Sequence, residues 1–170
     1  MGLQSTIAAS HSQLKRNLRD YSVFTSGDDI KVIRLTTIIN KYKDITSITI
    51  DSHSEIILSL DMPADIPLSR LRTNISTPIT TTENTFLYDI LPIKGYARFE
   101  DNVEKGDFLI HKVYDEDDEV NGTNYLWVLE VTEILGNYSH GRLSGRHFYC
   151  SPYTMAMPDE VQTIIDNYNT

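Results

Sequence analysis

The chain has 170 residues, 40% of them hydrophobic and 23% charged, which is enough for one folded core with small extensions. A formal net charge of −9 and a pI near 4.9 argue against a protein whose main task is to grip phosphate backbones, because that affinity comes from clustered Lys and Arg. No signal peptide or membrane-length apolar run is visible and the single Cys150 cannot form an internal disulfide, so we expect a soluble protein in a reducing cytosol.

The N-terminal region, residues 1–29, is expected to be a helix and a linker. Over residues 6–21 the apolar and aromatic residues recur at offsets of three and four, which places on one helical face Ile7, His11, Leu14, Leu18 and Tyr21. The segment 22–29, which contains Gly27, is expected to end this amphipathic helix.

Residues 30–61 are predicted to form a strand and a β-hairpin. The pattern over 30–42 fits a helix at its far end and a strand at 30–35, and we favour a strand followed by a turn. The β-branched runs 45–50 and 55–61 alternate with polar residues and flank the polar segment 51–54. We therefore expect a hairpin with its turn at 51–54.

Residues 62–85 are predicted to be an irregular arm or long loop. Pro63 and Pro67 oppose strand pairing, and residues 69–84 are polar and rich in Thr without sustained periodicity. A structureless segment of this length is unusual inside a compact domain, so we expect the arm to pack on a partner.

Residues 86–153 are predicted to form an antiparallel β-barrel or sandwich. The strand containing Trp127 is the strongest by content and is expected to be central, and residues 136–146 are expected to form a polar loop. The predicted strands, separated by turn-like or polar segments, are 86–92, 93–99, 108–114, 125–134 and 147–151.

The C-terminal region, residues 154–170, is expected to be a second amphipathic helix. Pro158 suits the first helical position, and Asp159 and Glu160 favour the positive end of the helix dipole. The apolar face comprises Val161, Ile164, Ile165 and Tyr168. The predicted fold is thus mainly β, a small antiparallel barrel or sandwich with an amphipathic helix at each end.

The acidic run 115–119 does not have the pattern of a calcium loop. An EF-hand needs Gly at its sixth position and Glu at its twelfth, where this chain has Val120 and Leu126. We expect a solvated turn at this run.

No zinc site or catalytic pair is expected either. His140, His147 and Cys150 lack a fourth ligand and paired knuckles, and two residues three apart on a strand point to opposite faces. Nothing near Cys150 in sequence would lower its pKa, so we expect a buried, inert thiol. The sequence predicts no catalytic residue, metal or cofactor.

The segment 141–146, Gly-Arg-Leu-Ser-Gly-Arg, is the one basic and flexible loop predicted in this acidic chain. Arg142 and Arg146 on a glycine-hinged loop could bind carboxylates or phosphates through two hydrogen bonds each. Two interpretations stay open, a mobile loop tip and a protein contact. Without P-loop spacing, nucleotide binding is not expected.

Part of the chain resembles the small β-barrel of the head-to-tail connector proteins of tailed bacteriophages, with head-closure or stopper proteins the nearest members. The resemblance covers about 65 residues and rests on four motifs in order. These are Lys-Gly-Asp-Phe-Leu-Ile at 105–110, Tyr-Leu-Trp-Val-Leu-Glu-Val at 125–131, Gly-Asn at 136–137 and His-Phe-Tyr-Cys-Ser-Pro at 147–152. In such proteins Gly allows the tight turn and Asp fixes it through the nearby backbone.

The resemblance implies a non-enzymatic virion protein, made in the host cytoplasm, that forms a ring or collar at the connector or tail. Its expected partners are further copies of itself and adjacent portal, adaptor or tail proteins, with passive contact to DNA in a lumen and no membrane contact. The residues expected at protein contacts are Arg142, Arg146, Asp115, Asp117, Asp118, Pro63 and Pro67.

The alternative from another class is an OB-like barrel that binds single-stranded nucleic acid or a small ligand. Such barrels use strand aromatics as stacking platforms, for which the candidates are Tyr96, Phe108, Tyr125 and Trp127. Aromatic residues at alternating strand positions are more often part of a core. An enzyme ranks third, because no nucleophile and base can be named.

Overall fold

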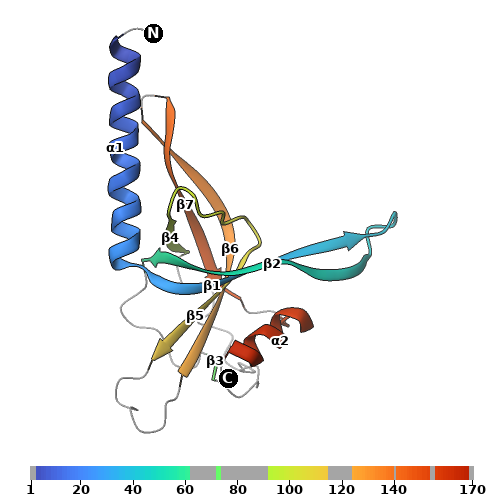
Figure 1. Ribbon diagram of the computed structural model, residues 1–170. Helices are drawn as coiled ribbons and strands as arrows, with labels where there is room; N and C mark the ends of the chain where they lie inside the picture. The colour runs from blue at the N-terminus through green and yellow to red at the C-terminus, as the bar shows by residue number, and fades with distance from the viewer. Residues whose placement is uncertain are drawn as a thin grey trace.

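The computed structural model describes residues 3–61, 72–73, 92–114, 124–139, 141–153 and 156–168. It is mainly β, with a helix at each end, as predicted (Figure 1). The elements in chain order are α1 (Leu3–Ser26), β1 (Asp28–Ile39), β2 (Ile45–Leu60), β3 (Arg72–Thr73), β4 (Ile93–Ala97), β5 (Phe108–Tyr114), β6 (Asn124–Ser139), β7 (Arg142–Pro152) and α2 (Asp159–Tyr168).

The strands form one antiparallel sheet in the order β3-β6-β5-β1-β2-β4-β7, and β6 pairs in addition with β7. The length of β6 makes this double pairing possible, because residues 124–130 pair with β5 while residues 129–139 pair with β7. Six strands are therefore linked in a continuous ring of pairings.

Both faces of β6 contribute to the core. Trp127, Leu129 and Val131 belong to one cluster of buried side chains, which also includes Ile30, Leu58, Phe148 and Cys150. Leu126 and Val128, on the other face, belong to a second cluster that Val161 and Ile165 of α2 cover. The prediction that the strand with Trp127 is central is confirmed, and α2 packs through its predicted apolar face.

The predicted hairpin turn at 51–54 is wrong. β2 runs without interruption from Ile45 to Leu60 and pairs with β1, and Asp51 is an extra residue at a shift of register opposite Arg34 and Leu35. Residues 51–54 are polar because they are exposed, not because the chain reverses there. A register shift of this kind bends a strand and increases its twist.

The chain reverses instead at 40–44. The side-chain oxygen of Asn40 accepts hydrogen bonds from the backbone N–H groups of Tyr42 (2.8 Å) and Asp44 (3.0 Å). Lys43 adopts a left-handed conformation, with φ of 69°. Beyond the strands that flank its base, the hairpin of β1 and β2 extends away from the body (Figure 1). We call residues 36–52 the projecting hairpin.

The predicted polar loop at 136–146 is also wrong. β6 and β7 continue to Ser139 and Arg142, so that most of this segment is paired strand. Its polarity has a different cause, since α1 lies against this end of β7 and makes polar contacts with it. Arg142 and Arg146 thus lie on a strand.

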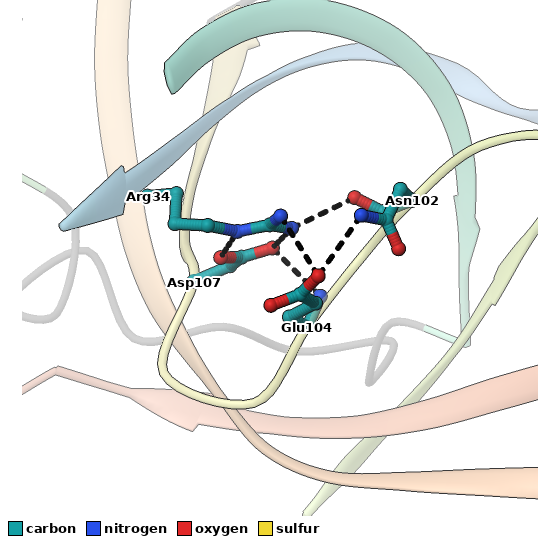
Figure 2. A network of polar contacts seen from close by, with 4 residues as sticks. All are labelled: Arg34, Asn102, Glu104 and Asp107. Carbon is teal, nitrogen blue, oxygen red and sulfur yellow. Dashed lines mark hydrogen bonds and ion pairs between the residues drawn. The ribbon is translucent and has the colours of Figure 1, made fainter. Parts of the chain in front are cut away.

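A buried ion pair ties the Gly-Asp turn to β1 (Figure 2). The guanidinium of Arg34 donates from Nε and Nη2 to the two carboxylate oxygens of Asp107, each at 2.8 Å, and from Nη2 to the carbonyl of Asn102 at 2.9 Å. Asp107 is only 1% exposed and accepts a further bond of 2.7 Å from the backbone N–H of Glu104. Gly106 has φ of 89°, which explains why glycine stands before Asp107.

Several predicted segments lie outside the described residues. They are the strand at 86–92, the acidic run 115–119 and the arm 62–85, except that Arg72 and Thr73 of that arm pair with β6. None of the helices in the described part of the chain is both long and apolar enough to cross a membrane.

Candidate interaction surfaces

Helix α1 packs on the sheet through a largely polar face. Ser12 and Val23 are buried there, and between them Arg16, Arg19 and Asp20 are half-buried. Asp20 accepts a hydrogen bond of 2.9 Å from the backbone N–H of Phe99. The helix is therefore held by specific polar contacts more than by its apolar stripe.

Two arginines make the contact between α1 and β7. The guanidinium of Arg16 lies 3.4 Å from the ring centroid of Phe99 and donates to the carbonyl of Leu143 (3.4 Å). Arg19 donates to the carbonyl of Arg146 (3.4 Å). Within the described residues neither guanidinium forms a salt bridge, and the buried Nε of Arg16 has no hydrogen-bond partner. Both positive charges lack a carboxylate counterion there.

These two arginines belong to a larger basic surface. Arg19 and Lys94 both lie over the ring of Tyr96, at 5.5 and 5.1 Å, so that α1 and β4 contribute to one patch. We define the basic surface as Lys15, Arg16 and Arg19 of α1, Lys94 of β4, and Arg142 of β7, whose strand partner Ser139 contacts His11 of α1. Arg146 points to the other face of β7, because its neighbours Gly145 and His147 face Arg19.

The neighbouring His147 adds no charge to the basic surface at pH 7. Burial lowers the pKa of its imidazole, and the positive charges of Lys94 and Arg19 lower it further. The imidazole is therefore neutral, and the positive charge of the surface comes from its Lys and Arg side chains.

The apolar stripe of α1 faces solvent. Ile7, Leu14, Leu18 and Tyr21 are 56–68% exposed and follow one another at helical spacing, opposite the face that packs on the sheet. We call these four residues the helix stripe. An exposed row of large apolar side chains on a folded protein is typical of a contact surface.

The projecting hairpin carries a second exposed apolar group. Ile39, Tyr42 and Ile45 are 58–73% exposed at and beside the turn, and Lys41 and Lys43 lie among them. A two-stranded ribbon is only marginally stable alone in water, so this one gains stability when a neighbour covers it.

Of the residues predicted at protein contacts, the structure describes Arg142 and Arg146, and both are exposed. The other five, Asp115, Asp117, Asp118, Pro63 and Pro67, lie outside the described residues. The sequence analysis missed Lys15, Arg16, Arg19 and Lys94. Their clustering could have indicated a basic patch, since Lys15, Arg16 and Arg19 fall within five residues of one predicted helix in an acidic chain.

The described residues contain no group of three His, Cys, Asp or Glu side chains that could hold a metal ion. His147 contacts the rings of Tyr96 and Tyr149, whereas Cys150 lies in the core, so the two are on opposite faces as expected. Cys150 is buried, and its thiol donates to the carbonyl of Ile93 at 3.5 Å.

The thiol of Cys150 is expected to be unreactive in the native protein, because burial raises its pKa from 9.0 to about 12. The folded state favours the neutral thiol, so this contribution to stability is complete below pH 9 and is lost as the pH rises toward 12. A chromogenic disulfide reagent should label the chain only after unfolding. Labelling of native protein within minutes at pH 8 would contradict the expectation.

The aromatic residues proposed as stacking platforms have different environments. Phe108 and Trp127 are buried in the two core clusters and cannot stack on a base. Tyr96 is half-buried among Arg19, Lys94 and His147. The side chain of Tyr125 is outside the described set. Of the four proposed stacking residues, Tyr96 is therefore the one described side chain that could still stack on a base in the OB-like alternative.

Comparison of the chain with known protein families, curated proteins and solved structures gave no match. The two exposed apolar groups and the basic surface are the candidate interaction surfaces of the described residues.

Proposed function

We propose that this protein is a non-enzymatic structural subunit of a tailed-phage particle, part of a ring or collar at the head–tail connector or in the tail. In this proposal the ring of pairings from β6 through β5, β1, β2 and β4 to β7 is a small antiparallel barrel. The resemblance over residues 86–153 includes the Gly-Asp turn, whose aspartate bonds the nearby backbone here.

The projecting hairpin is the observation that carries the proposal. The seven residues that follow Ile33, the last residue that pairs with β5, reach Asn40 and span roughly 23 Å at the rise of a strand. The exposed apolar group therefore lies at the far end of the projecting hairpin. It is a different surface from the helix stripe, which lies on α1 of the same chain. Contacts between different surfaces of identical subunits are heterologous, and heterologous contacts generate rings when the rotation closes.

The net negative charge of the chain is compatible with a ring through which DNA passes. The partners are further copies and adjacent portal, adaptor or tail proteins in the virion, after synthesis in the host cytoplasm. A net charge of −9 on each subunit would repel DNA in a lumen and let it slide past.

The triple variant Ile39→Asp/Tyr42→Asp/Ile45→Asp tests the proposal. All three positions are solvent-exposed, so the melting temperature should stay within about 2 °C of the wild type. The variant should lose co-sedimentation with megadalton particles in a density gradient of the native lysate, where the wild type co-migrates.

The matched control is Ser52→Asp/Ser54→Asp, which adds carboxylates to exposed polar positions of β2. It should co-sediment like the wild type. A wild-type chain recovered only as a small species would refute the virion assignment, and a triple variant that still co-sediments would refute the role of the projecting hairpin.

A further inference from the structure

Within the described residues, Arg16 and Arg19 of the basic surface form no salt bridge. The carboxylates of Asp20, Asp61 and Glu133 lie in the neighbourhood of its five cations. Arg16 and Arg19 donate to backbone carbonyls, and Arg19 also faces the side-chain amide of Asn137, and all of these groups are neutral. An anionic partner would supply a counterion for the two guanidinium groups.

The opposite end of the molecule has complementary charge. Helix α2 contains Asp159, Glu160 and Asp166 and no Lys or Arg. Val161 and Ile165 face the core, whereas Asp159 and Asp166, seven residues apart and thus on one side of the helix, are exposed. Lys31 and Lys112 lie over the ring of Tyr168, at the C-terminal end of the helix that also contains Asp166.

Helix α2 lies at the far end of the molecule from the turn between β6 and β7, beside which α1 runs (Figure 1). The basic surface, on α1, β4 and β7, and the acidic side of α2 therefore belong to different parts of one subunit (Figure 1). Two copies in the same orientation can bring them together.

We propose that the basic surface binds the acidic side of α2, centred on Asp159 and Asp166, of a second copy of this chain. The contact is head-to-tail, because each copy offers both halves and neither half can pair with itself. The inference rests on the proposed function for the premise that copies assemble, and adds which surfaces meet.

A second copy fits this surface better than nucleic acid does. The net charge of −9 opposes binding to phosphate backbones at a distance, and the helix stripe beside Lys15 offers apolar contact that a DNA backbone would not use.

Charge reversal on each side gives a direct test with the full-length chain. One variant carries Lys15→Glu/Arg142→Glu and the other Asp159→Lys/Asp166→Lys, and all four positions are exposed. The wild type should self-associate in analytical ultracentrifugation at about 0.05 M NaCl and less at about 0.5 M. Each variant alone should associate at least about 100-fold more weakly, because like charges then face each other.

A mixture of the two variants should recover association, and so should one chain with all four substitutions, because opposite charges meet again. Lys105→Glu, at an exposed position outside the basic surface, α2 and the projecting hairpin, is the control for charge change outside the proposed contact and should associate like the wild type. Circular dichroism and melting curves establish that every variant is folded.

Three results would overturn the inference: a wild type that stays monomeric at low salt, single variants that associate like the wild type, or mixtures that fail to recover. Duplex DNA bound by the wild type and not by Lys15→Glu/Arg142→Glu, without self-association, would assign the surface to phosphates instead. Recovery in the mixture without co-sedimentation with particles would refute the virion assignment and leave this contact standing.

Discussion

Arg34→Met is expected to lower the free energy of unfolding by about 3–5 kcal/mol, the usual effect of removing one partner from a buried ion pair. The substitution leaves the carboxylate of Asp107, 1% exposed, without the two hydrogen bonds of 2.8 Å that compensate its burial. It also frees the segment around Asn102 that the same guanidinium holds. Denaturation in urea, with an unchanged m-value, measures the loss.

Glu104→Gln is the control for this prediction. The side chain of Glu104 approaches the same guanidinium at 3.0 Å but is 54% exposed, so its loss should cost less than about 1 kcal/mol. Arg34→Lys should fall between the two, because an ammonium keeps the charge but cannot bind both carboxylate oxygens as a planar fork. Equal effects of Arg34→Met and Glu104→Gln would contradict the assignment of the buried pair.

Phe148→Ala should have a comparable effect, about 3–5 kcal/mol, because it leaves a cavity among the buried side chains inside the ring of strands. The ring of Phe148 lies directly against Gly95 of the paired strand β4, in the space that a β-carbon at Gly95 would occupy. Gly95→Ala should therefore also destabilise, by about 1–3 kcal/mol through overpacking.

The two positions can be tested against each other. Because the alanine methyl and the ring compete for one space, Gly95→Ala/Phe148→Leu should be more stable than the sum of its single substitutions predicts. Additive effects in denaturant titrations would show that the two side chains do not share that space.

Much of the secondary structure was predictable. Clear apolar periodicity is present in β5, in the first half of β6 and in the helix at 158–169. The β6 pattern even separated its two buried faces, Trp127 with Leu129 and Leu126 with Val128. The predicted turn at 51–54 and the predicted polar loop at 136–146 were both wrong for one physical reason. In both segments the polar residues belong to strands that extend beyond the core, one into solvent and the other against a polar face of a helix. The polarity of a segment does not by itself distinguish such a strand from a turn.

The candidate surfaces were predictable only in part. Arg142 and Arg146 stood out in the sequence, but the position of Arg142 beside α1 depends on a contact between Ser139, its strand partner, and His11, 128 residues apart in the chain. The apolar face of α1 was found correctly at Ile7, Leu14 and Leu18. Its orientation toward solvent could not be read from periodicity, because the usual rule turns such a face inward.

The separation between α1 and its docking site also governs how the protein is made. Leu143 and Arg146, whose carbonyls receive the two arginines, are translated 127 residues after them. At ordinary elongation rates this is a delay of roughly 6 to 25 s. During that time α1 lacks the two carbonyl partners that β7 supplies. We therefore expect the polar face of α1 to stay incompletely covered until the last long strand is complete.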